Sequence, residues 1–185
     1  MNKITLRYSI LIAAILGMAM LRLIPHYPNI TPIGAMALFG GAYFSKKWQA
    51  FLIPLGALFI SDIAINFIVY QKFVLFHSMW LGVYGSFALI VGLGVIILKK
   101  INAKNVIFAS LSASLLFYII SNFGVWVVDP INMYPNTGTG LFACYIAGLP
   151  YLLGTIFGDF FYSAVFFTAF ELVQSRFLVL KPIKI

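Results

Sequence analysis

Residues 50–60 read AFLIPLGALFI and residues 87–98 read FALIVGLGVIIL, and neither stretch contains a charged or hydrogen-bonding side chain. Both are apolar on every face, so they predict helices surrounded by lipid or by other helices. In the bilayer core every backbone N–H and C=O group has to be paired within the protein, which leaves helix bundles and closed barrels. Barrel strands alternate polar and apolar residues over about ten positions, and these stretches do not. The sequence therefore predicts an all-α membrane helix bundle.

The composition of the whole chain points the same way. Of 185 residues, 63% are apolar and 9% are charged, and the mean hydropathy is +1.04. Soluble domains contain roughly 45–50% apolar and about 25% charged residues, so this chain has too few polar side chains to cover a surface in water. We expect one integral membrane domain over residues 1–185. The single cysteine, Cys144, excludes an intrachain disulfide and a CxxC redox motif.

Six apolar runs are candidates for membrane-spanning helices, because a helix needs about 17–25 residues to cross roughly 30 Å of hydrocarbon. The second run is the shortest, and its alternative interpretation is a re-entrant or interfacial segment. We expect it to cross, because the charge pattern described next depends on it. The six runs cover residues 8–24, 31–44, 48–70, 79–98, 106–128 and 151–173.

The basic residues are distributed unevenly between the two sides of such a bundle. If six helices alternate in direction, only Arg22 and Lys72 lie on one side. Short cytoplasmic loops retain Lys and Arg, so the N and C termini are both predicted to be cytoplasmic. We therefore interpret the positive charge of +8 as a signal of topology in a multi-pass membrane protein, not of binding to nucleic acid. The other ten basic residues share the opposite side: Lys3, Arg7, Lys46, Lys47, Lys99, Lys100, Lys104, Arg176, Lys181 and Lys184.

Two segments have alternative interpretations. The first run resembles a signal peptide with a small-x-small cleavage site at Gly17-Met18-Ala19, but the apolar run continues to Ile24, so we expect a retained anchor. Residues 129–140 (DPINMYPNTGTG) are rich in turn-forming residues and predict a loop. The short apolar run 141–149 ends at Pro150 and is predicted to be a half-helix or re-entrant hairpin.

The polar residues at membrane depth are the candidates for function, because ionisable groups there cost about 2.5–3.5 kcal/mol and usually face a bundle interior or a water-filled cavity. The predicted topology places several of them in the outer half of the bundle, whereas Glu171 lies near the inner headgroups. Asp62 and Asn66 are one helical turn apart, as are Asn122 and Trp126. We expect an outward-facing pocket for a small polar ligand, lined by Asp62, Asn66, Asn122, Trp126 and Asp159.

The connection over residues 25–32 (PHYPNITP) lies on the same side and contains three prolines, which stiffen it. We expect it to act as a lid over the pocket, with His26 and Asn29 in contact with the ligand. In a simpler interpretation Asp62 and Asp159 only bond to neighbouring helices, and in another they form a proton relay.

No motif in the sequence indicates catalysis or a cofactor. The sequence contains no GxSxG, P-loop or HExxH pattern, so the chain cannot itself use ATP in the usual way. His26, His77 and Cys144 are the metal-ligating residue types present, and their spacing matches no metal motif, so we expect no metal site. The small residues Gly34-Ala35 and Gly40-Gly41 predict close helix packing, whereas the Ala13/Gly17 face is available to a partner helix.

The run 22–44 (RLIPHYPNITPIGAMALFGGAYF) contains the pattern HxPNxTPIGAMALFGGAYF, which resembles the signature of a bacterial multi-pass membrane family that is itself uncharacterised. Further matching pieces are Ser61-Asp62, residues 84–87 (YGSF), residues 121–126 (SNFGVW), Tyr134-Pro135, Cys144-Tyr145, Leu149-Pro150 and Gly158-Asp159.

In size and layout this family is similar to the substrate-binding S components of energy-coupling-factor (ECF) transporters. Those six-helix proteins capture vitamins, their precursors or metal ions, and a separate T component with two ATPases energises them. The resemblance implies an outer-leaflet site closed by the loop between the first two helices, and a contact between helix 1 and the T component. We therefore expect a substrate-binding subunit for uptake of a small vitamin-like molecule. The alternatives are a structural or assembly protein, and a membrane enzyme acting on a lipid or isoprenoid through Asp62 and Asp159.

Overall fold

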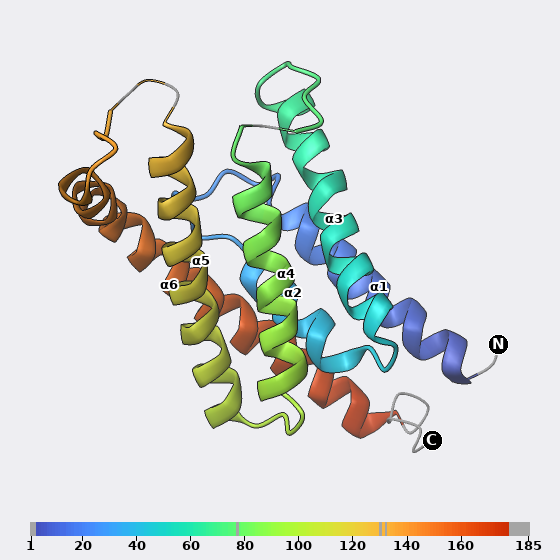
Figure 1. Ribbon diagram of the computed structural model, residues 1–185. Coiled ribbons are helices and arrows are strands. Elements are labelled where there is room, and N and C mark those ends of the chain that lie inside the picture. The colour runs from blue at the N-terminus through green and yellow to red at the C-terminus, as the bar shows by residue number, and fades with distance from the viewer. Residues whose placement is uncertain (1–2, 77, 130, 132, 178–185) are drawn as a thin grey trace.

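The computed structural model describes residues 3–76, 78–129, 131 and 133–177. These residues form six α-helices and their connections, with no strand in the described part of the chain. The all-helical bundle predicted from the sequence is confirmed (Figure 1). The helices are α1 (Lys3–Leu21), α2 (Ile33–Tyr43), α3 (Lys47–Ile68), α4 (Trp80–Ile97), α5 (Ala103–Val128) and α6 (Gly138–Arg176).

Four of these helices, α3 to α6, are long and apolar enough to cross a membrane. Of the other two, α1 is apolar over Leu6–Leu21, and α2 is the shortest of the six helices. The 11 residues of α2 extend over only about 17 Å at 1.5 Å per residue, about half of a hydrocarbon core of roughly 30 Å. At this length α2 is too short to cross the hydrocarbon core on its own.

Helix α2 lies at the centre of the bundle, and ten of its eleven residues are buried. It packs along α4, and α5 packs along α6. The C-terminal half of α2 places Phe39 and Tyr43 against two aromatic rings of α6. The ring centroids of Phe39 and Phe167 are 5.5 Å apart, and those of Tyr43 and Phe170 are 4.5 Å apart. Such a helix gains stability from packing on all sides and not from an amphipathic face.

Glycines bring α2 and α4 into backbone contact. A Cβ atom on Gly41 would lie 2.3 Å from the carbonyl oxygen of Val91, and one on Gly94 would lie 2.7 Å from the carbonyl oxygen of Leu38. Both distances are shorter than any real Cβ contact, so only glycine allows this spacing. The close helix packing predicted for Gly40-Gly41 is confirmed, since a Cβ atom on Gly40 would meet the ring of Pro54 at 2.2 Å.

Helix α6 corrects the prediction for residues 141–149. It is one helix of 39 residues that begins at Gly138 and continues through Pro150, so residues 141–149 form neither a separate half-helix nor a hairpin, and the loop ends before Gly138. Thr137 caps the start, because its Oγ1 accepts a hydrogen bond of 3.2 Å from the Gly140 N–H. Proline removes one hydrogen bond but is tolerated in membrane helices when the surroundings compensate, and Figure 1 shows α6 changing direction in its first half.

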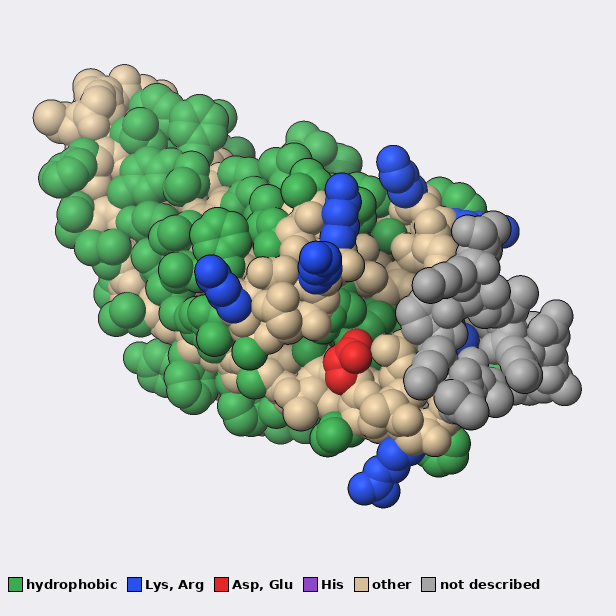
Figure 2. Space-filling model, turned by 90° about the horizontal axis from the view of Figure 1, so that it is seen from below, with side chains coloured by type: hydrophobic (Ala, Val, Ile, Leu, Met, Phe, Trp, Pro, Cys, Tyr) green, Lys and Arg blue, Asp and Glu red, His purple; other side chains and the backbone are tan. Residues whose placement is uncertain are grey.

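The two ends of the bundle differ in charge. The α2–α3 and α4–α5 connections lie at the same end as the N-terminus of α1 and the C-terminus of α6 (Figure 1). Basic side chains gather on this end around an acidic patch (Figure 2). We call it the basic end. Of the basic residues predicted to share a side, Lys181, Lys184 and the side chain of Lys3 lie outside the described part of the chain. The others lie here: Arg7, Lys46, Lys47, Lys99, Lys100, Lys104 and Arg176.

The α2–α4 contact yields a stability prediction. Gly41→Ala and Gly94→Ala each force the two helices apart, and overpacking of this kind costs about 1–3 kcal/mol. Thermal unfolding of the detergent-purified protein should therefore show a lower midpoint for both variants. Gly92→Ala is the matched control, because a Cβ atom on Gly92 meets nothing within 4 Å. Equal midpoints for Gly92→Ala and Gly94→Ala would contradict the contact.

Candidate functional site

A cavity of about 270 Å³ lies inside the bundle, lined by residues of all six helices or of the connections next to them. We call it the polar cavity. Its lining combines charged and hydroxyl groups with an apolar wall, which is the usual composition of a small-molecule site. The lining residues are Arg22, Asn29, Thr31, Ile33, Gly34, Asp62, Val83, Phe87, Ile90, Phe117, Thr155 and Asp159.

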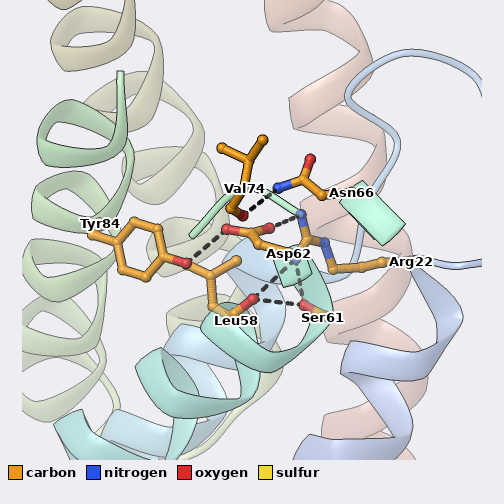
Figure 3. Close-up of polar contacts among 7 residues, drawn as sticks. All are labelled: Arg22, Leu58, Ser61, Asp62, Asn66, Val74 and Tyr84. Carbon is orange, nitrogen blue, oxygen red and sulfur yellow. Dashed lines mark hydrogen bonds and ion pairs between the residues drawn. The ribbon is translucent and has the colours of Figure 1, made fainter. Parts of the chain in front are cut away.

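An ion pair forms one side of the polar cavity (Figure 3). The Nη2 atom of Arg22 lies 2.8 Å from Oδ1 of Asp62, and the two side chains are 12% and 14% exposed. Tyr84 of α4 donates a hydrogen bond of 2.7 Å to the other carboxylate oxygen of Asp62. Arg22 also donates to the Ser61 hydroxyl. Because Arg22 directly follows α1, this pair ties the end of α1 to α3 and α4.

Asp159 of α6 is the second carboxylate in the lining. Its side chain is 2% exposed, and its Oδ2 accepts a hydrogen bond of 2.6 Å from Ser114 of α5. A Cβ atom on Gly34 would lie 2.0 Å from Oδ1 of Asp159, so the absence of a side chain in the first turn of α2 makes room for the carboxylate. Asp159 thus lies where α2, α5 and α6 meet.

The α1–α2 connection lines the cavity with Asn29 and Thr31 and packs on α6. Glycines of α6 provide the space, since Cβ atoms on Gly154 and Gly158 would lie 2.5 Å from the Pro28 carbonyl oxygen and 2.9 Å from the Thr31 nitrogen. Asn29 has a φ of 63°, a left-handed conformation in which asparagine is enriched. Its Nδ2 atom donates to the Tyr151 carbonyl oxygen at 3.4 Å. The connection is therefore held in place by backbone contacts with α6.

Four of the residues predicted to bind ligand lie elsewhere. Asn66 donates to the Val74 carbonyl oxygen at 3.0 Å in the α3–α4 connection, and Asn122 donates to the Tyr118 carbonyl oxygen at 2.8 Å within α5. Trp126 donates to the Pro135 carbonyl oxygen at 3.0 Å. The exposed His26 contacts the Ile24 carbonyl oxygen at 2.6 Å. The polar cavity is thus lined by three of the seven predicted residues, Asp62, Asp159 and Asn29.

Sequence reasoning did not place Arg22 and Thr155 in the site. Arg22 entered the sequence analysis only as one of two basic residues on the side that also holds Asp62. Thr155 precedes Asp159 by four residues, and in a helix this spacing puts both side chains on one face. The predicted side of Arg22 and the spacing of Thr155 from Asp159 could therefore have indicated both residues from the sequence.

A larger opening of about 680 Å³ lies between α5 and α6 toward the basic end. We call it the α5–α6 groove. Its walls are mostly apolar, and the buried hydroxyls of Ser110 and Ser163 have no hydrogen-bond partner there among the described residues. Glu171 lines its end and accepts a hydrogen bond of 2.7 Å from Tyr43. None of the predicted site residues lines this groove.

The described residues contain no group of three or more His, Cys, Asp and Glu side chains that could hold a metal ion. Cys144 is buried, and its thiol donates to the Asn122 carbonyl oxygen at 3.4 Å. His77 lies outside the described residues. The polar cavity therefore has no metal centre built from its described residues.

The ion pair can be tested by a double-mutant cycle. Arg22→Met leaves the Asp62 carboxylate buried without its cation, which costs about 3 kcal/mol or more, and should lower the midpoint of thermal unfolding. Arg22→Met combined with Asp62→Leu should recover most of this loss. Lys72→Met, which removes an exposed cation from the same end of the bundle, is the control. A loss in Arg22→Met no larger than in the control would contradict a buried pair.

Comparison with known proteins identifies the family of this chain but not an activity. Neither the curated proteins nor the solved structures contain a match to the chain. Residues 2–181 match the sequence profile of DUF6580, a family of unknown function. The match covers nearly the whole chain, and the protein therefore belongs to the DUF6580 family.

Proposed function

We propose that this protein is a substrate-binding membrane subunit that captures a small, vitamin-like molecule in the polar cavity for uptake into the cell. The observation that carries the proposal is the cavity itself, in which Asp159 and the Arg22–Asp62 pair meet beneath the α1–α2 connection. Its volume of about 270 Å³ lies just below the range of about 300–1,000 Å³ for drug-sized ligands. A small molecule fits it and a polymer does not.

The orientation in this proposal has six crossings, with both termini in the cytoplasm of a bacterial cell. The position of the basic end supports it, because short cytoplasmic loops retain Lys and Arg. The polar cavity lies in the half of the bundle away from that end and would then open toward the outside. Helix α2 would cross together with the connection that precedes it.

Uptake in this proposal needs a partner, because the sequence has no nucleotide-binding motif. In an arrangement like that of ECF transporters, a T component with its ATPases would supply the energy. The Ala13/Gly17 face of α1 is exposed, and a Cβ atom on Gly17 meets nothing within 4 Å. This face leaves room for a closely packed partner helix.

A structural or assembly role is the second candidate, and one observation favours it. Both oxygens of the Asp62 carboxylate already have partners in the chain, Arg22 and Tyr84. A group satisfied in this way supports the bundle without any ligand. The two roles differ in whether a small molecule stabilises the folded protein.

A thermal-shift screen against vitamins, their precursors and divalent metal ions separates the two roles. A ligand at a hundred times its dissociation constant stabilises the folded state by about 2.7 kcal/mol, so one compound should raise the unfolding midpoint. Thr155→Val removes a hydroxyl from the cavity wall and should weaken that binding about fivefold, since a hydrogen bond contributes about 1 kcal/mol.

Thr168→Val is the matched control, because it makes the same change in α6 outside the polar cavity. An equal loss of binding in both threonine variants would place the ligand elsewhere. A cooperative unfolding transition that no compound shifts would favour the structural role.

A further inference from the structure

We infer that the polar cavity selects a small organic cation with a flat apolar or aromatic body. This inference rests on the proposed function and names the chemical class of its substrate. It follows from the charges, the free hydrogen-bonding atoms and the aromatic wall of the cavity, taken in turn.

The charges of the cavity leave one carboxylate without a cation. Arg22 and Asp62 neutralise each other across 2.8 Å, whereas Asp159 has no ion pair among the described residues and receives one hydrogen bond, from Ser114. Its neighbour Gly34 belongs to the first turn of α2, and the N-terminus of a helix favours a negative group. A ligand entering this buried site therefore gains most if it brings a positive charge to Asp159.

An anionic ligand would find its natural partner occupied. The guanidinium of Arg22 already contacts the Asp62 carboxylate, the Ser61 hydroxyl and the Leu58 carbonyl oxygen. Among the described residues, Arg22 is the only basic side chain that lines the cavity. An anion would have to displace Asp62 while lying close to Asp159, and leaving a buried carboxylate unpaired is strongly unfavourable.

Two neutral groups of the lining, Thr155 and Asn29, can accept hydrogen bonds from a ligand. Thr155 donates its hydroxyl hydrogen to the Tyr151 carbonyl oxygen at 2.9 Å, and the Asn29 amide donates to the same oxygen at 3.4 Å. The Thr155 oxygen and the Asn29 side-chain carbonyl keep lone pairs for a ligand. Together with Oδ1 of Asp159 they suit a group with several N–H donors, such as an ammonium, an amidinium or a protonated ring nitrogen.

The apolar wall contains two aromatic rings. Phe87 of α4 and Phe117 of α5 both line the cavity, and their rings stack with centroids 5.1 Å apart and an interplanar angle of 27°. The face of an aromatic ring attracts a cation within about 6 Å of its centre. The rings thus suit the same charged ligand and also pack against a flat body.

Three probes with one ring and different charges test this inference: benzylammonium, benzyl alcohol and benzoate. Binding is measured by thermal shift and by calorimetry on the full-length protein in detergent, up to about 10 mM, where a millimolar affinity of about −4.1 kcal/mol is detectable. Benzylammonium should bind at least tenfold more tightly than benzyl alcohol, and benzoate should bind least. Asp159→Asn should remove the preference for the cation.

Glu171→Gln is the matched control, because it makes the same change of carboxylate to amide in α6 outside the polar cavity. It should keep the order of the three probes. If Asp159→Asn does not fold, Phe117→Leu replaces it and should weaken benzylammonium about twofold to fivefold while changing benzyl alcohol less.

The outcomes separate the inference from the proposed function. Benzoate or benzyl alcohol binding as tightly as benzylammonium would overturn the selectivity for cations and leave a substrate-binding role intact. Binding of Na⁺ or Mg²⁺ in competition with benzylammonium, with a tighter affinity, would also overturn it. If no probe binds and no compound of the vitamin screen shifts the unfolding midpoint, both the inference and the proposed function are wrong.

Discussion

The ion pair between Arg22 and Asp62 is the interaction on which the geometry of the site depends. A lone charge at membrane depth costs about 2.5–3.5 kcal/mol on insertion scales, and pairing Arg22 with Asp62 lowers this cost for both groups. Their contact of 2.8 Å fixes the point at which the chain leaves α1. The connection to α2 starts at that point, and its residues Asn29 and Thr31 line the polar cavity.

The short helix α2 supplies the second constraint. It is buried on all sides, so its neighbours have to adapt to it, and they do so through glycine. Gly41 and Gly94 bring α2 onto α4, while Gly34 leaves space for the Asp159 carboxylate at the start of the helix. The cavity exists because α2 begins only at Ile33, leaving room between the α1–α2 connection and the surrounding helices.

The sequence predicts the helices well, because apolar runs and charged breaks report membrane-spanning segments directly. It fails at residues 141–149, where Pro150 suggested a break, while the observed helix continues through the proline, which membrane helices tolerate. Within the site, Asp62, Asp159 and Asn29 were predicted from depth and side, and all three line the cavity. Arg22 was not predicted, because pairing across helices depends on rotations and tilts that helix periodicity does not determine. Thr155 was also missed, although it shares a helix face with Asp159.

The central claim is that the polar cavity opens on the side of the membrane opposite the basic end, and cysteine accessibility tests it most directly. In a Cys144→Ala background, Thr155→Cys places a thiol in the cavity wall and Ser175→Cys places one near the basic end. A membrane-impermeant thiol reagent added to intact cells should label the cysteine at 155 and not the one at 175, which should react only after the membrane is opened. Labelling of 175 alone in intact cells would contradict the claim.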